Sequence, residues 1–328
     1  MKKDLSNIIK PTLDSHYVNT DMFSDIPVYH DKINDEVKPQ PAPNCFLGAY
    51  YRKVFSAKDN WLGIEGVIKL GEFKPDDKRF GYDNRVDYKR YLDNPSIYMG
   101  GHATAESDAG LGWNTGYLTG DTSEAINYGT PRVAYRPFWR YIYSQVTDVE
   151  GNVERHNINS WNITDAKRFE YYYLPGDVIK MTVYSPLDHY LQLKIEVIET
   201  TTIEKYVNQR KAYQLKDDKP SHFYSPLFRS EGHGVTQAEF KRVNSMDQYG
   251  NEGFIVKHTD AKVSEATWQE VYLLRKIEGK LVKVPFDKSR QSSMICPNVA
   301  SFTVDSNSKL EVLGGETITI HPTYKVKE

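Results

Sequence analysis

The sequence predicts an all-β protein built as an antiparallel two-sheet sandwich. Many short runs rich in Val, Ile, Tyr and Phe recur at near-regular spacing, with Gly and Pro between them. Helical periodicity is scarce, and no repeat of roughly 20–50 residues appears, which argues against a propeller or a solenoid. Aromatic residues make up 13% of the 328 residues, and 24 of them are Tyr, a residue that favours strands.

The first 44 residues differ from the rest because they are polar and dotted with proline, ending in EVKPQPAPNC. Proline lacks a backbone donor and favours extended backbone, so residues 1–44 are expected to form an N-terminal arm or linker. Residues 45–328 are expected to form a single large domain, which is an ordinary size for a sandwich. The arm is expected to pack on this domain through Ile8, Ile9 and Phe23.

The strand-like runs follow one another along the whole domain. CFLGAYYRKVF opens it, NWLGIEGVIKL follows, and residues 95–113 read as strand, Gly-Gly bend and strand. Two proline residues in PRVAYRPFWRYIYSQV indicate an edge strand or a bulge. The later strands are expected at 178–184, 190–199, 235–243, 253–258, 270–276, 281–284, 299–304, 310–313 and 316–321.

Three segments fit this pattern less well. SEATWQEVYLLRKI, residues 264–277, suits either a helical turn or a strand. Residues 114–131 and 204–234 are expected to be long loops, and loops of that length in a compact domain are usually functional or mobile.

Charge and cysteine content narrow the functional classes. The net charge is −2 with both signs mixed, so no nucleic-acid-binding surface is expected. The sequence contains no run of about 18 apolar residues, so no membrane span is expected. The two cysteines, Cys45 and Cys296, either form a disulfide or remain two unpaired thiols, and they cannot build a zinc site. No metal and no cofactor is expected.

The stretch GGHATAESDAGLGWNTG, residues 100–116, contains two carboxylates two residues apart, with glycines on both sides. If residues 104–113 are a strand, Glu106, Asp108 and two glycines share one face, and Ala109 and Trp113 share the other. The second face has the composition of a core. The two carboxylates are either catalytic, calcium-binding or sugar-binding groups, or simply the solvated side of a strand. The glycines leave room either for a ligand or for a neighbouring side chain.

A second strand has the same character. In HGVTQAEFKRVNSM, Gln237, Glu239 and Lys241 share one side, and Phe240 lies on the other. If both polar faces line one concave sheet, Asp108 and Glu239 approach each other. Adjacent carboxylates resist double ionisation, so the pKa of one rises and an acid–base pair results.

AESDAGLGW, YYYLPGDVIKMTVYS and TQAEFKRVNS together resemble the motifs of the glutamic peptidases, the eqolisin family. The resemblance spans about residues 60–250 and implies a concanavalin-like jelly-roll sandwich. It implies that Glu239 matches the catalytic glutamate and that Asp108 occupies the position of the catalytic glutamine. Glutamine is a neutral donor to an oxyanion, so Asp108 can replace it only while protonated.

Other side chains are candidates for ligand contact. Trp113 and Trp139 either stack on sugar rings or pack in the core, and the flanking Arg136 and Arg140 make Trp139 the better exposed candidate. His233 lies in a glycine-rich loop before the Glu239 strand and is either a pH-sensitive site group or a solvated side chain. Gln237 and Lys241 complete the predicted ligand-binding set, and the alternative for Lys241 is a simple ion pair with the neighbouring acids.

Three functions follow from these features. The first is a non-enzymatic module that binds a glycan or an extended peptide on its concave face. The second is an acid hydrolase, a glutamic peptidase or a glycosidase, with Glu239 as general acid–base and Asp108 as its protonated partner, Glu106 being the third catalytic candidate. The third is a structural protein that associates with itself through its tyrosine-rich surface. An extracellular, cell-surface or spore-surface location is expected, although the first residues do not read as a signal peptide.

Overall fold

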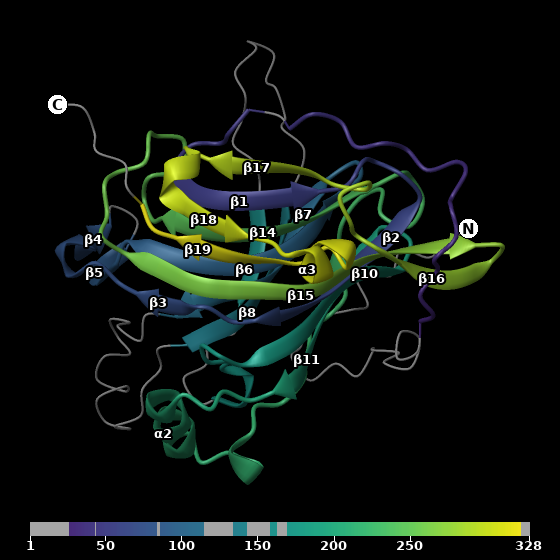
Figure 1. Ribbon diagram of the computed structural model, residues 1–328. Coiled ribbons are helices and arrows are strands. Elements are labelled where there is room, and N and C mark those ends of the chain that lie inside the picture. The colour runs from purple at the N-terminus through teal and green to yellow at the C-terminus, as the bar shows by residue number, and fades with distance from the viewer. Residues whose placement is uncertain are drawn as a thin grey trace.

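The computed structural model of the chain describes residues 26–42, 44–83, 86–114, 134–142, 158–162 and 169–322. It confirms the predicted class, because two antiparallel sheets form a sandwich (Figure 1). None of the helices in these described ranges has the length and apolar character of a membrane span.

The first sheet has seven strands in the order β17-β1-β14-β6-β7-β8-β9. Its strands run antiparallel to their neighbours, and the β6–β7 hairpin lies at its centre. Their bounds are β17 (Ser292–Cys296), β1 (Ala49–Phe55), β14 (Glu239–Gln248), β6 (Asp93–His102), β7 (Glu106–Asn114), β8 (Ala134–Ile142) and β9 (Ile158–Asn162).

The second sheet has ten strands, of which seven follow the order β12-β11-β10-β2-β15-β19-β18. β13 pairs with β11, and both β16 and β3 pair with β15. Their bounds are β12 (Phe223–Tyr224), β11 (Tyr190–Glu199), β10 (Val178–Leu187), β2 (Trp61–Lys69), β15 (Lys262–Ile277), β19 (Glu316–Ile320), β18 (Phe302–Asp305), β13 (Phe228–Arg229), β16 (Lys280–Pro285) and β3 (Glu72–Lys74). A separate hairpin joins β4 (Phe80–Asp83) to β5 (Val86–Tyr91).

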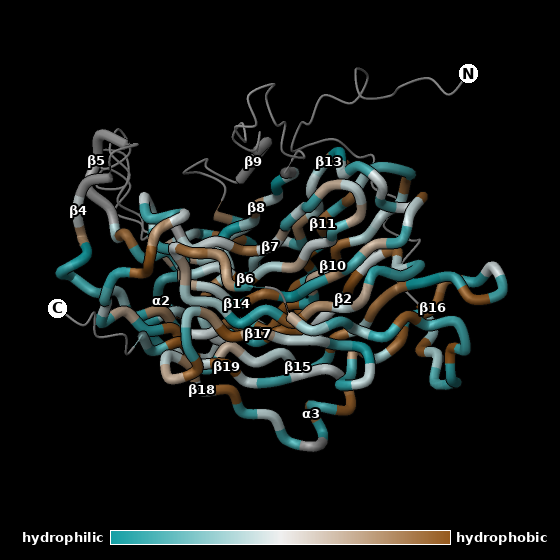
Figure 2. The backbone as a smooth tube through the Cα atoms, turned by 90° about the horizontal axis from the view of Figure 1, so that it is seen from above, coloured by the Kyte–Doolittle hydropathy of each residue, from teal (hydrophilic) through white to brown (hydrophobic). Residues whose placement is uncertain are grey.

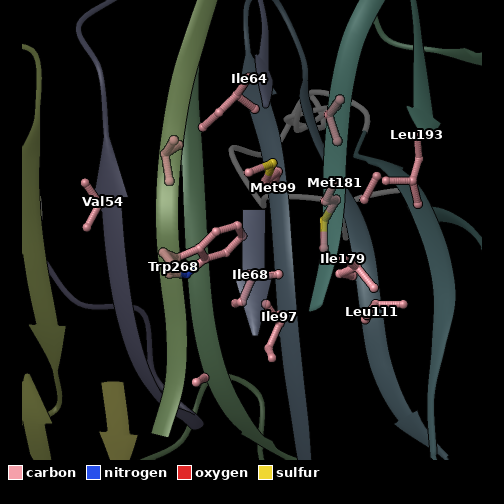
Figure 3. Packing of buried hydrophobic residues seen from close by; sticks show 14 of the residues in the cluster. Val54, Ile64, Ile68, Ile97, Met99, Leu111, Ile179, Met181, Leu193 and Trp268 are labelled. Carbon is pink, nitrogen blue, oxygen red and sulfur yellow. The ribbon is translucent and has the colours of Figure 1, made fainter. Parts of the chain in front are cut away.

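The core lies between the two sheets. Ile68 and Trp268 of the ten-stranded sheet belong to the same buried cluster as Ile97, Met99 and Leu111 of the seven-stranded sheet (Figure 3). Successive residues of a strand point to opposite faces, so the inward positions alternate with outward ones along each strand. This alternation fixes which side chains are left for the outer faces.

Polar groups also bridge the two sheets. Arg242 of β14 is 1% exposed, and its Nη1 lies 2.8 Å from Oε1 of Glu316 on β19. Trp268 donates its indole N–H to Oδ1 of Asn244 at 2.7 Å. Both pairs satisfy groups that would otherwise be buried without a partner, and they fix how the sheets sit on each other.

The predicted arm and the cysteines can now be placed. Residues 1–25, including Ile8, Ile9 and Phe23, lie outside the described residues. Residues 26–42 have almost no regular structure and run from β16, where Val28 bridges to Lys283, to β17, where the Gln40 carbonyl accepts from the Ser292 hydroxyl. Cys45 at the start of the domain is bonded to Cys296 in β17, with their Cα atoms 5.9 Å apart. The disulfide ties the N-terminal end of the domain to an edge strand of the seven-stranded sheet.

Three local expectations were wrong. Residues 204–234 are not one loop, because they contain α2 (Glu204–Ala212), the short 3-10 helix η5 (Lys216–Asp218), β12 and β13. Residues 310–313 belong mostly to a helix, α3 (Ser308–Val312), and 253–258 form no strand. Further 3-10 turns are η3 (Asp77–Arg79), η4 (Phe169–Tyr171) and η6 (Val299–Ser301). Residues 264–277 are strand, and 115–131 lie outside the described residues.

Candidate functional site

The predicted acidic residues lie on the outer face of the seven-stranded sheet. In β7, Ala109 and Leu111 point into the core cluster, so Glu106 and Asp108 point away from it, as the alternation predicts. Glu239 alternates with the buried Phe240 and therefore shares this outer face.

Two rows of side chains cross β14, β6 and β7 on this face. In the first, Lys241 is paired in register with Gly100, and Gly100 with Asp108. In the second, Glu239 is paired with His102, and His102 with Glu106. Paired residues on neighbouring strands stand on the same side of the sheet, so each row is a line of adjacent groups.

Asp108 is held between two cations. Its Oδ2 accepts from Nε of Arg140 at 2.7 Å and lies 2.5 Å from Nη2, and its Oδ1 lies 2.8 Å from Nζ of Lys241. Burial raises the pKa of Asp108, but Lys241 and Arg140 outweigh it and lower that pKa to about 2. Asp108 is therefore ionised at neutral pH, and the expectation that it serves as a protonated partner was wrong.

Lys241 is shared between two carboxylates. Its ammonium group binds Glu106 as well as Asp108, and its side chain is only 5% exposed. The charge of Lys241 lowers the pKa of Glu106, and burial of Lys241 is outweighed by the two acids, which raise its own pKa. A permanently charged network, rather than a proton-sharing pair, occupies the first row.

Glu239 makes a separate ion pair. Its Oε1 lies 3.2 Å from Nζ of Lys53 in β1, and both side chains are 19% exposed. β6 separates Glu239 from the strand that bears Asp108, and each acid has its own cation. The two therefore share a face, as predicted, but Asp108 is 1% exposed and does not meet Glu239 in an open groove.

His102 stands between Glu239 and Glu106 in the second row. The side chain is exposed to solvent on one side. Partial burial of the ring, together with the charge of Lys58, lowers the pKa of His102. A neutral imidazole offers one N–H donor and one acceptor, and it is placed beside two carboxylates. This row is the part of the face where solvent reaches titratable groups.

The glycines on this face do not leave a vacant site. A Cβ atom at Gly110 would lie 2.5 Å from the carbonyl oxygen of Ile97, and one at Gly100 would meet the Ser107 carbonyl. The space is filled by neighbouring strands. Only at Gly112 is the nearest atom, in the Phe138 ring, at an ordinary 3.7 Å.

Three residues predicted to contact a ligand are buried, and for the two tryptophans this is the core-packing alternative. Trp113 and Trp139 are 5% and 3% exposed and belong to the core cluster, so neither is a surface platform for a sugar. His233 is fully buried, where its Nδ1 is 2.9 Å from Oγ of Ser230 and burial lowers its pKa to about 4. Gln237 is exposed just before β14, and Lys241 is committed to its ion pairs.

Two residues that the structure brings to the site, Lys53 and Arg140, were not among the predicted site residues. Lys53 reaches it from β1, and no local signal shows that β1 pairs with β14. Arg140 was assigned to Trp139, yet consecutive strand residues point apart, and Arg140 bonds Asp108 instead. The alternation alone could have revealed this second case.

No metal site is apparent among the described residues, because no three His, Cys, Asp or Glu side chains there are arranged so that they could hold a metal ion. The candidate site thus consists of carboxylates, ammonium groups and one imidazole. Such a set can bind charged or hydrogen-bonding chains and can transfer protons.

Comparisons with known proteins complete the description. No protein-family model and no curated protein matches the chain. The fold is similar to Scytalido-glutamic peptidase in complex with a peptide-based transition-state analogue, at 10% identity and a TM-score of 0.44 over 83% of this chain and 98% of that one. It is also similar to SCP-B, an eqolisin in complex with the tripeptide Ala-Ile-His, at 11% identity and a TM-score of 0.41 over 84% and 98%. The peptidases that the sequence resembles are thus among the solved structures that the fold is similar to, at values that carry no conclusion about activity.

Proposed function

We propose that the chain is a hydrolase that uses the row of Glu239, His102 and Glu106 on peptide substrates. The observation that carries this proposal is that three titratable groups stand side by side on neighbouring strands, at the solvent-accessible end of one face. Peptide is the substrate class that the sequence resemblance implies.

The chemistry assigns Glu239 as the general base. Its carboxylate, paired with Lys53, takes a proton from water, and the hydroxide oxygen bonds to the carbonyl carbon of the scissile amide. The carbonyl π electrons move to the oxygen, where a neutral His102 can donate a hydrogen bond. The protonated Glu239 then gives its proton to the leaving nitrogen, the C–N bond breaks, and a carboxylic acid and an amine result.

Asp108 has a positioning role in this scheme. It holds Lys241 and Arg140, and Lys241 in turn binds Glu106. The ionised network fixes the strand ends on which the reacting row stands. This differs from the acid pair that the motif resemblance implies, because Glu106 and His102 replace Asp108 as the neighbours of Glu239.

The test is hydrolysis of a mixture of synthetic peptides from pH 3 to pH 7, read by mass spectrometry. Glu239→Gln keeps the shape but removes the base, and we expect a loss of about 100-fold or more. Glu278→Gln, on the exposed β15–β16 turn, is the matched control and should match the wild type. Equal cleavage by the wild type and Glu239→Gln would contradict the proposal.

A second candidate function is peptide binding without cleavage on the same face. The pairing of Asp108 with both Lys241 and Arg140 favours it, because this carboxylate is then engaged in ion pairs and not available for proton transfer. Here the wild type would retain peptides without cutting them at any pH. Fluorescence anisotropy with labelled peptides would register that retention, and Glu239→Gln would weaken it by about 10-fold or less.

A further inference from the structure

A groove of about 670 Å³ lies on the other side of the molecule, against the outer face of the ten-stranded sheet. Its floor includes Lys180 of β10, Val67 of β2 and Glu270 of β15, which are paired in register across the three strands. Val67 alternates with the fully buried Ile68, so this floor faces away from the core.

The helix α3 and its flanks form one wall of the groove. Lys309, Leu310 and Leu313 line it from this side. Figure 2 shows α3 beyond β15 and β18, on the side away from β14 and β6. Ile198 of β11, which is 51% exposed, and Lys283 of β16 complete the rim.

Positive charge prevails around the groove. Lys180 and Lys194 share one carboxylate, because their Nζ atoms lie 2.8 Å and 3.1 Å from the two oxygens of Glu196. Burial lowers the pKa of Lys180, but the bond to Glu196 and the negative charges of Glu196, Glu65 and Glu270 together outweigh it and raise that pKa, so the ammonium stays charged. Lys180 is therefore balanced by nearby acids, and the positive excess in the lining comes mainly from the further lysines, Lys283 and Lys309, which with Lys180 outnumber the one lining acid, Glu270.

Two other charged groups of the lining have partners of their own. Lys283 pairs with Glu65 at 2.9 Å and covers the ring of Tyr272, while Glu270 accepts from the Tyr272 hydroxyl at 3.1 Å. Lys309 adds an exposed ammonium on the helical wall. Val67, Leu310 and Leu313 offer an apolar surface in the same groove.

From these features we propose that the groove binds an anionic amphiphile, a carboxylate or sulfonate on an apolar body. The acid group meets Lys180 and Lys309, and the body packs on Val67, Leu310 and Leu313. The volume lies within the range of roughly 300–1,000 Å³ that is typical of small-molecule sites. This site is separate from the proposed hydrolytic row and does not depend on it.

The probe is 8-anilinonaphthalene-1-sulfonate, whose fluorescence rises in an apolar site. Lys309→Glu is expected to weaken its binding by about 3- to 10-fold, and Leu310→Asp by about 10-fold or more. Lys262→Glu reverses an exposed lysine near the other end of β15 and serves as the matched control, with unchanged binding. A thermal melt of each variant confirms that it is folded.

Displacement tests the charge preference. Decanoate is expected to displace the probe, whereas decyltrimethylammonium, with the same chain and opposite charge, is not. Lys180→Gln is the second variant, because it acts from the sheet floor if the α3 variants alter the helix. Unchanged binding in Lys309→Glu, Leu310→Asp and Lys180→Gln, or equal displacement by both amphiphiles, would overturn the proposal.

Discussion

The outer faces of the two sheets use the same residue types to different ends. On the seven-stranded sheet, the side chains of Asp108 and Lys241 are 2% and 5% exposed, and each has two ion-pair partners. On the ten-stranded sheet, the side chains of Lys180 and its partner Glu196 are 23% and 22% exposed, and Lys180 lines a groove. The strength of an ion pair depends on how far water is excluded, so the first network fixes structure and the second remains open to a ligand.

The largest expected difference between the faces is in stability. Asp108→Asn removes the buried negative charge that Lys241 and Arg140 share. We expect this substitution to lower the free energy of unfolding by about 3–5 kcal/mol. Glu196→Gln on the other face should cost less than about 1 kcal/mol. Urea unfolding of both variants measures the contrast, and similar losses would mean that the two networks do not differ as described.

Acid should remove the same contribution in the wild type. The pKa of Asp108 is lowered from 3.8 to about 2, so its stabilisation is present above pH 4 and is lost as the pH falls through about 2. The gap in unfolding free energy between wild type and Asp108→Asn is expected to narrow by about 2 kcal/mol between pH 5 and pH 2. Unfolding curves at several pH values would show this, and a gap that stays constant speaks against an ionised Asp108.

The smallest expected effect distinguishes two glycines within the seven-stranded face. Gly110→Ala drives a methyl group against the backbone of β6, at a cost of about 1–2 kcal/mol. Gly112→Ala meets only the Phe138 ring at an ordinary distance and should be neutral or stabilising by a few tenths of a kcal/mol. Thermal melts of the pair suffice, and the reverse order would show that strand packing at Gly110 is looser than the distances indicate.

Local patterns predicted the sandwich and the faces of its central strands. The alternation around Asp108 assigned each residue to the correct side, because a half-buried strand repeats every second residue. The same rule places Trp139 opposite Arg140, so the burial of Trp139 was readable although it was given an exposed role. Patterns could not supply which strands are neighbours, and therefore Lys53 was not connected with Glu239.

The helices were missed for different reasons. In α2, only Tyr206 and Arg210 are buried, so no apolar stripe marks it, and Arg210 is held by the buried carboxylate of Asp177. In α3, the short run from Leu310 suits a strand equally well, although Asn307 caps it by accepting from the Leu310 N–H. The Asn307 cap is the local feature from which α3 could have been predicted. No such local feature marks α2, which is held by the ion pair of Arg210 with Asp177, a residue distant in the sequence.

The bond between Cys45 and Cys296 makes the intervening chain, 251 positions long, a closed covalent ring. A single scission of the backbone anywhere inside this ring therefore releases no fragment while the sulfur atoms stay joined. Nicked and intact molecules differ in mass by only one water until a reductant separates the two pieces. Any assay for internal cleavage of this protein, including cleavage by another copy of the same protein, therefore has to be run under reducing conditions.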